Sequence, residues 1–134
     1  MDNIIAYALY AISNDKSFAL LKTIAITNKD EKGDSHTLRN KLKLTPKQYY
    51  SRISRLRKAH LIRKEHGKYY LTASGIVVYD ARMVVENAIN NYYKLAAVDS
   101  LVFSDSNNML SLEDRTNIID SLIEDQQIKQ FLIV

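Results

Sequence analysis

Apolar positions repeat at helical spacing over much of the chain, which predicts a mostly helical protein. The first amphipathic helix is expected at about residues 16–27. Its apolar face holds Phe18, Leu21, Ile24 and Ala25. A charged loop over residues 28–34 is expected next, and a shorter helical pattern follows at residues 37–44.

The clearest helix is expected from Pro46 to about Ala59. Thr45 precedes it as the N-cap, and proline suits the first helical position because the N–H it lacks has no partner there. The inner face of this helix holds apolar residues at intervals of four and three: Tyr49, Ile53 and Leu56. The remaining face carries polar and basic residues: Lys47, Gln48, Ser51, Arg52 and Arg55.

Two short extended runs, 61–66 and 68–72, flank Gly67 and predict a β-hairpin with a basic tip. Thr72 then acts as the N-cap of a long helix, expected from about Ala73 to Leu101. This helix carries two apolar strips, which predict two packing partners. One strip holds Ala81, Val85, Ala88, Tyr92 and Leu95, and the other holds Ile76, Val77, Val84 and Ile89.

The C-terminal part predicts a smaller helical appendage. After a loop over residues 104–108, Ser111 and Asp114 have the spacing of a helix N-terminus. The helix that follows has apolar residues on one face: Ile118, Ile119, Leu122 and Ile123. The segment 126–134 is again amphipathic.

Composition excludes several kinds of chemistry. The chain of 134 residues has three glycines and no cysteine, which rules out disulfides, cysteine-ligated metals and glycine-rich phosphate loops. His36, His60 and His66 lack metal-ligand spacing and lie among cations, so neither a metal nor another cofactor is expected. No nucleophile motif is present, and the chain is not expected to be an enzyme.

Charge is distributed unevenly. Residues 36–70 contain eleven Lys/Arg and one Glu, a net charge of +10, whereas the rest of the chain has a net charge of −6. A solvated surface ordinarily mixes both signs. The basic segment therefore favours an anionic partner, above all nucleic acid.

No apolar stretch reaches the roughly 20 residues that a membrane-spanning helix needs. The apolar run 3–14 has no basic segment before it, so it is not expected to be a signal peptide. A cytoplasmic protein without membrane contact is expected.

The order helix, short helix, turn, helix, basic hairpin, long helix resembles the winged helix-turn-helix domain of prokaryotic transcription regulators. The resemblance covers about residues 17–79, close to half the chain. One stretch, TLRNKLKLTPKQYYSRISRLRKAHLI, looks like the helix-turn-helix with its recognition helix. Another, KYYLTASG, is similar to the return strand of the wing and the next helix start in small archaeal regulators.

The sequence departs from that family at two positions. The family often has glycine between the two helices of the motif and again after the recognition helix, where this chain has Lys43 and His60. If either residue adopts a left-handed conformation, the cost relative to glycine is about 1 kcal/mol.

The resemblance implies that residues 46–59 enter the major groove of duplex DNA and that residues 61–72 form a wing on the flanking groove. Gln48 can pair bidentately with adenine, and Arg52 with guanine. The recognition-helix candidates are Lys47, Gln48, Tyr50, Ser51, Arg52 and Arg55. The wing candidates are Lys64, His66 and Lys68, and the candidates for phosphate contact are Arg39, Lys43 and Thr45.

These features predict a mostly α-helical winged helix-turn-helix protein with a small β-hairpin wing and a long dimerisation helix. The expected divisions are an N-terminal apolar segment for dimer contact (1–15), the winged domain (16–79), the long helix (73–103) and a C-terminal appendage (104–134). The expected dimer interface holds Ala81, Val85, Ala88, Tyr92 and Leu95. In a monomer, the helix around residues 118–123 would have to cover that strip instead.

Three functions are compatible with the basic segment. A sequence-specific, homodimeric transcription regulator that binds duplex DNA is favoured, with no effector identified. A winged-helix module that binds acidic proteins is the second. An RNA-binding module is the third, and it is disfavoured because single-strand readers usually expose aromatic side chains on a sheet larger than one hairpin.

Overall fold

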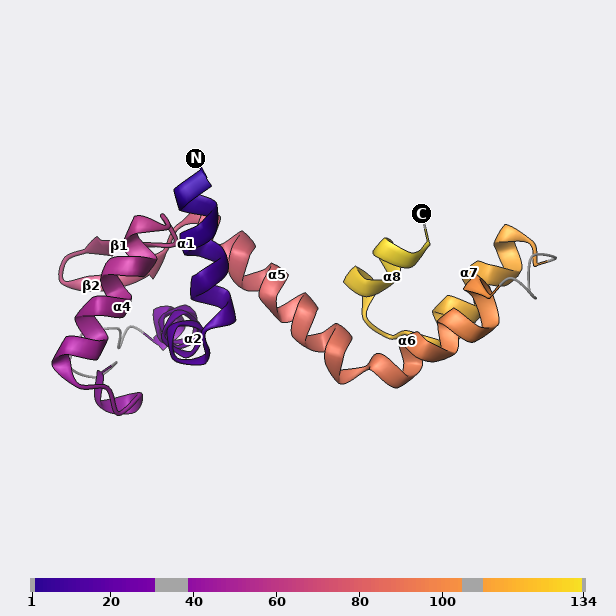
Figure 1. Cartoon of the computed structure of the whole chain (residues 1–134), viewed down its shortest axis with the longest axis horizontal. Coiled ribbons are helices and arrows are strands. Elements are labelled where there is room, and N and C mark those ends of the chain that lie inside the picture. The colour runs from indigo at the N-terminus through magenta and orange to yellow at the C-terminus, as the bar shows by residue number, and fades with distance from the viewer. Residues whose placement is uncertain (1, 31–38, 105–109, 134) are drawn as a thin grey trace. The chain divides into compact units, whose positions relative to one another are not determined.

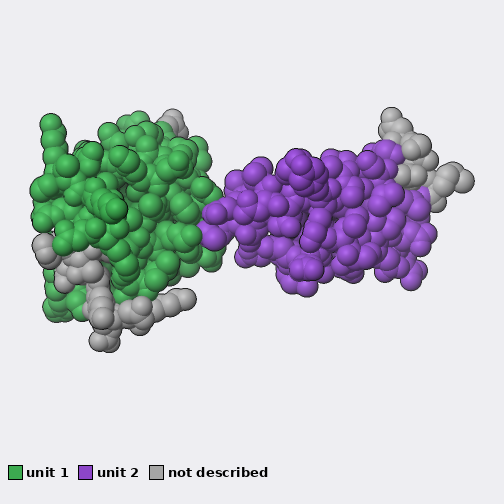
Figure 2. All heavy atoms as spheres, turned by 90° about the horizontal axis from the view of Figure 1, so that it is seen from below, with its two compact units in different colours: residues 1–82 green, residues 83–134 purple. Residues whose placement is uncertain are grey.

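The computed structural model describes residues 2–30, 39–104 and 110–133. These residues are mostly helical, with one two-stranded antiparallel hairpin (Figure 1). The chain divides into two compact units, Met1–Arg82 and Met83–Val134, coloured separately in Figure 2. The spacing of apolar residues therefore predicted the dominant type of secondary structure correctly.

Unit 1 begins with two helices, α1 (Asp2–Ser13) and α2 (Asp15–Asp30). The expected helix at 16–27 is confirmed, and it continues through the first residues of the expected loop; residues 31–38 lie outside the described residues. The N-terminal segment packs against α2 and against α4 (Pro46–Lys58), so it has a place within unit 1. The core of unit 1 includes Leu20, Leu21, Ile24, Tyr49 and Leu56.

A tight turn leads into α4. Residues 39–41 are helical, and the Leu44 N–H donates to the Arg39 carbonyl oxygen at 3.1 Å while the Lys43 N–H donates to that of Asn40 at 3.2 Å. This is the Schellman pattern, which places the residue at Lys43 in the left-handed region. Lys43 has φ 54°, so this non-glycine residue does adopt the left-handed conformation.

The N-cap expected for α4 is confirmed. The Gln48 N–H donates to Thr45 Oγ1 at 3.2 Å, and the Thr45 N–H donates to Gln48 Oε1 at 3.0 Å. This reciprocal pair forms a capping box, which satisfies two backbone donors at the helix start.

A second Schellman pattern ends α4. The His60 N–H donates to the Arg57 carbonyl oxygen and the Leu61 N–H to that of Leu56, both at 3.0 Å. His60 has φ 59°, so it too occupies the conformation that glycine adopts at lower cost. Leu56 and Leu61 are both buried, which supplies the apolar contact that accompanies this motif.

The hairpin consists of β1 (Ile62–Glu65) and β2 (Lys68–Leu71). Glu65 pairs with Lys68, which leaves His66 and Gly67 as a two-residue turn. Both turn residues have positive φ, at 50° and 78°. That is the requirement of a type I′ turn, whose twist matches the twist of the strands.

Thr72 joins the hairpin to the next helix, α5 (Ala73–Asn90). Its hydroxyl donates to the His60 carbonyl oxygen at 2.5 Å and accepts the Gly75 N–H at 2.9 Å, which confirms the expected N-cap. Gly75 is buried, and a Cβ at this position would overlap the carbonyl oxygen of Leu61. The packing therefore explains the glycine in the LTASG stretch, because only glycine allows α5 to approach the start of β1 this closely.

The expected continuous helix from Ala73 to Leu101 is wrong. It is interrupted at Asn91, followed by α6 (Tyr92–Val98) and a π-helical turn, η1 (Asp99–Phe103). Asn91 Nδ2 donates to the Asn87 carbonyl oxygen at 2.8 Å, and the backbone of Asn91 leaves the helical region with φ −113° and ψ 25°. Asparagine side chains that bond to nearby backbone carbonyls compete with helix propagation in this way.

Unit 2 is completed by α7 (Leu112–Leu122) and α8 (Gln126–Leu132). Ser111 Oγ accepts the Asp114 N–H at 3.1 Å, which confirms the expected start of α7. Residues 105–109 of the expected loop lie outside the described residues. The core of unit 2 consists of Val98, Val102, Ile119, Ile123 and Ile128.

Candidate nucleic-acid interface

The two units carry opposite net charges. Unit 1 has sixteen Lys/Arg and seven Asp/Glu, a net charge of +9, whereas unit 2 has three and eight, a net charge of −5. Within unit 1, α4 has five Lys/Arg and no Asp/Glu. None of these five side chains forms an ion pair with a described carboxylate. The surface of α4 is therefore a concentrated and uncompensated source of positive charge.

The buried residues of α4 define its outward face. Tyr49, Ile53 and Leu56 are buried, so the residues opposite them on the helix face solvent. That exposed face consists of Lys47, Ser51, Ser54 and Lys58. No side chain of these four residues makes a hydrogen bond to a described residue, so all four side-chain donors are available to a ligand. Ser54 and Lys58 were missed by the sequence prediction, although the same intervals of four and three that identify the inner face also locate them.

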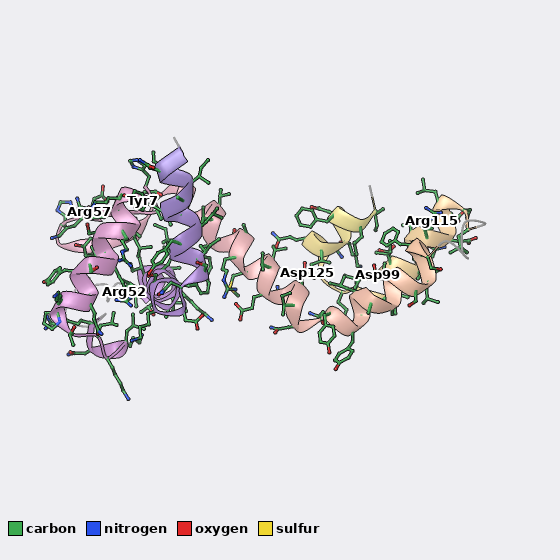
Figure 3. The ribbon with its side chains drawn as sticks, in the orientation of Figure 1. Tyr7, Arg52, Arg57, Asp99, Arg115 and Asp125 are labelled. Atoms are coloured by element: carbon green, nitrogen blue, oxygen red, sulfur yellow. The ribbon has the colours of Figure 1, made fainter. Side chains whose placement is uncertain are left out.

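Gln48 and Arg52 do not lie on that outward face as expected. Both are half-buried, because they border the inner face of α4. The Gln48 side chain is occupied by the capping box, and Arg52 Nη1 donates to the Gln48 carbonyl oxygen at 3.4 Å. Arg52 and Arg57, both labelled in Figure 3, project from different sides of α4.

Arg55 is exposed but tethered. Its Nη1 donates to the hydroxyl of Tyr10 at 2.9 Å, and its guanidinium lies 4.9 Å from the centre of the same ring. A cation over a tyrosine ring is stabilised by the negative face of the π system. Helix α1 therefore holds Arg55, one of the recognition-helix candidates, in a defined position.

A shallow hollow of about 460 Å³ separates α4 from β2. Its lining consists of Tyr50, Ile53, Ser54, Arg57, Lys58 and Tyr69. The Tyr50 side chain is 56% exposed and contacts the Tyr49 ring edge-on, with ring centres 5.1 Å apart. The sequence prediction also missed Arg57, because only the hairpin brings a second wall to this side of the helix.

The hairpin presents Lys64 and His66 to solvent, whereas Lys68 is half-buried. The ammonium of Lys64 lies 5.7 Å from the centre of the Tyr69 ring. Tyr69 is buried and Tyr70 is half-buried, as the alternation of side chains along a strand predicts. Arg63, on the same strand as Lys64, forms an ion pair with Glu65 and lies over the Tyr70 ring.

The three candidates for phosphate contact come together at the turn before α4. Lys43 is exposed and Arg39 is half-buried, while the Thr45 hydroxyl serves as the helix cap. Lys43 is therefore the one of the three whose charged group is both exposed and without another described contact.

The expected dimer strip does not form one exposed face. Ala88 and Leu95 pack against the core of unit 2, because α7 and α8 cover that side of the chain. This is the intramolecular partner expected for a monomer. Ala81, Val85 and Tyr92 are exposed. Helix α5 also exposes Ile76, and four more of its exposed apolar residues form a ridge at intervals of four: Val77, Ala81, Val85 and Ile89.

Among the residues that the structure describes, no group of three or more His, Asp or Glu could hold a metal ion. No described helix is long and apolar enough to cross a membrane. Comparisons of the chain with protein-family models, with curated proteins and with solved structures found no match.

Proposed function

We propose that this protein is a sequence-specific regulator of transcription that binds duplex DNA as a homodimer. The observation that carries the proposal is α4: a capped helix with five Lys/Arg, no carboxylate and no described ion pair. Such a surface favours an anionic partner, and a DNA duplex offers closely spaced phosphates together with a groove that admits one helix.

The order of elements in unit 1 supports a winged helix-turn-helix. Residues 39–41 and α4 would be the two helices of the motif, the β1–β2 hairpin would be the wing, and α5 would follow it. The two Schellman turns and the capping box hold α4 at both ends. A helix held in this way suits a recognition element, because base reading needs side chains in fixed positions.

The exposed residues of α4 have distinct roles in this proposal. Lys47, Ser51 and Ser54 face outward and would contact base edges, and Arg55 would act from the position that Tyr10 gives it. Lys58 would contact backbone phosphates next to the hollow, together with Arg57. Lys64 and His66 at the hairpin tip would reach the flanking groove.

The experiment that tests the proposal is selection of bound sequences from random duplex DNA with the full-length protein. We expect enrichment of a two-fold-related site, because a symmetric dimer places two equal helices in successive major grooves. Competition with a hairpin RNA and with polyglutamate tests the other partners. Equal competition by either of them, or no enrichment at all, would contradict the proposal.

The homodimer is proposed on the apolar ridge of α5, where Val85 is 55% and Ile89 is 66% exposed. Apolar side chains in an exposed row are unfavourable in water, and a second copy would bury them. Val85→Glu should convert the dimer to a monomer in light scattering and weaken operator binding. Glu113→Gln, an exposed change in α7, serves as the control. A parent protein that scatters as a monomer at micromolar concentration would rule out the dimer.

A further inference from the structure

Unit 2 contains a hollow of about 310 Å³ beside the helix break at Asn91. Its walls come from the end of α5, the start of α6, the residues that join α7 to α8, and α8 itself. The lining consists of Asn87, Asn91, Lys94, Ile123, Glu124, Asp125 and Ile128. The volume lies at the lower end of the range for small-molecule sites, so only a small ligand fits.

Asp125, labelled in Figure 3, has a structural role in this hollow, because its carboxylate bonds to other residues of the protein. Its Oδ1 accepts the N–H groups of Gln127 at 2.9 Å and Ile128 at 3.1 Å, which caps α8. Its Oδ2 accepts a hydrogen bond from Asn87 Nδ2 at 3.1 Å, which links the cap to α5. Both oxygens of this carboxylate are therefore engaged, and the wall between α5 and α8 is held in place.

Several other polar groups of the lining remain available. Asn87 and Asn91 use their amide N–H₂ groups as donors, and no described residue donates to either amide oxygen. Lys94 and Glu124 are both exposed, and neither forms an ion pair with a described residue. The residues that line this single hollow thus carry two amide acceptors, one free carboxylate and one free ammonium, and Ile123 and Ile128 add apolar side chains.

This set of groups matches a small molecule that carries both charges. We infer that the hollow binds a free α-amino acid. The ligand's ammonium donates to the amide oxygens of Asn87 and Asn91 and pairs with Glu124. The ligand's carboxylate pairs with Lys94, and an aliphatic side chain lies against Ile123 and Ile128. Charge-assisted hydrogen bonds of this kind are about twice as strong as neutral ones, which gives a small ligand a usable affinity.

Two other kinds of small ligand, a monocarboxylate and a primary amine, differ from an amino acid because each carries only one of the two charges. A monocarboxylate would use Lys94 but leave the carboxylate of Glu124 without a partner, and a primary amine would do the reverse. Neither molecule satisfies both charged groups, so each should bind more weakly than the zwitterion. The inference does not depend on the proposed function of unit 1, since it rests on residues of unit 2 alone.

The test is isothermal titration of the full-length protein with each of the twenty free amino acids. We expect saturable binding of at least one aliphatic member, such as L-leucine. Its two truncated analogues, isoamylamine and 4-methylpentanoate, should each bind at least about tenfold more weakly. Lys94→Gln and Glu124→Gln should each reduce the affinity for the amino acid by about tenfold. Glu113→Gln, in the same unit but outside the hollow, should leave it unchanged.

Circular dichroism provides the folding control, because both substituted side chains are exposed and unpaired and their loss should not change the helical signal. No saturable binding of any of the twenty at millimolar concentration would overturn the inference. Equal binding of L-leucine and one truncated analogue would overturn the assignment of a zwitterion. Unchanged affinity in both variants would place the ligand elsewhere.

Discussion

Units 1 and 2 each have a small core formed mainly by helices, but the two cores are built from different structural elements. Unit 1 uses a hairpin, three non-glycine residues of positive φ and a buried glycine to bring its elements close together. Unit 2 has no strand among its described residues, and its buried core consists only of valine and isoleucine. The net charges are +9 and −5. An anionic polymer is therefore attracted to one unit and repelled by the other, and precise local geometry is concentrated in the unit that attracts it.

The charge difference between the units predicts a steep salt dependence of DNA binding. With about three to five phosphate contacts per subunit, the slope of log affinity against log salt should be about −5 to −9 for a dimer. Affinity should then fall by about 10³- to 10⁵-fold between 50 and 200 mM salt. Fluorescence anisotropy of a labelled duplex measures this, and a slope near zero would assign the basic surface to another partner.

Matched lysine variants sharpen this contrast. Lys58→Ala, on the outward face of α4, should flatten the slope by about 2 in the dimer, because one phosphate contact is lost from each subunit. Lys94→Ala, in unit 2, should leave the slope unchanged. An equal effect of both variants would mean that net charge, and not the surface of α4, governs binding.

The close approach of α5 to β1 predicts a large loss of stability in unit 1. Gly75→Ala should lower the free energy of unfolding by about 3 kcal/mol, because the added methyl group meets a backbone carbonyl that cannot move independently. Gly67→Ala provides the control, since its Cβ would meet nothing within 4 Å. Only its left-handed conformation opposes the change, at about 1 kcal/mol. Urea denaturation followed by circular dichroism compares the two, and an equal loss would contradict the steric explanation.

The contact between α1 and α4 predicts a moderate effect on DNA binding. Tyr10→Phe keeps the ring under Arg55 but removes the 2.9 Å hydrogen bond, so Arg55 loses one of its two restraints. We expect the affinity for the best duplex to fall by about fivefold, which corresponds to about 1 kcal/mol. Tyr7→Phe, on the same helix, is the matched control and should have no effect. If Arg55→Ala weakens binding and Tyr10→Phe does not, the hydrogen bond has no positioning role.

The smallest expected effect is a gain in stability. His60→Gly should raise the free energy of unfolding by about 1 kcal/mol, because glycine adopts the left-handed conformation at the end of α4 without steric cost. Arg57→Gly, three residues earlier within the helix, should lower it by about 1 kcal/mol. Thermal denaturation of the pair measures the difference. If His60→Gly is instead less stable, the imidazole contributes more to the free energy of unfolding than the left-handed backbone conformation costs.

The amino-acid sequence by itself determined the local features of unit 1. Thr45, Pro46 and Thr72 marked helix starts, Gly67 marked the hairpin, and the spacing of Tyr49, Ile53 and Leu56 defined the inner face of α4. These predictions succeeded because caps, turns and helical faces depend on residues within four or five positions of one another. For Lys43 and His60 the sequence predicted only a cost if they were left-handed, and both residues do adopt that conformation.

Only the tertiary structure decided how distant segments modify those local patterns. The helix expected to reach Leu101 is broken at Asn91, and α7 and α8 cover Ala88 and Leu95, which the strip alone suggested were free. Likewise, Tyr10, forty-five residues away, holds Arg55 through a hydrogen bond. Periodicity locates an apolar or polar face but not its partner, because a partner distant in the chain is chosen by packing and by competition for hydrogen bonds.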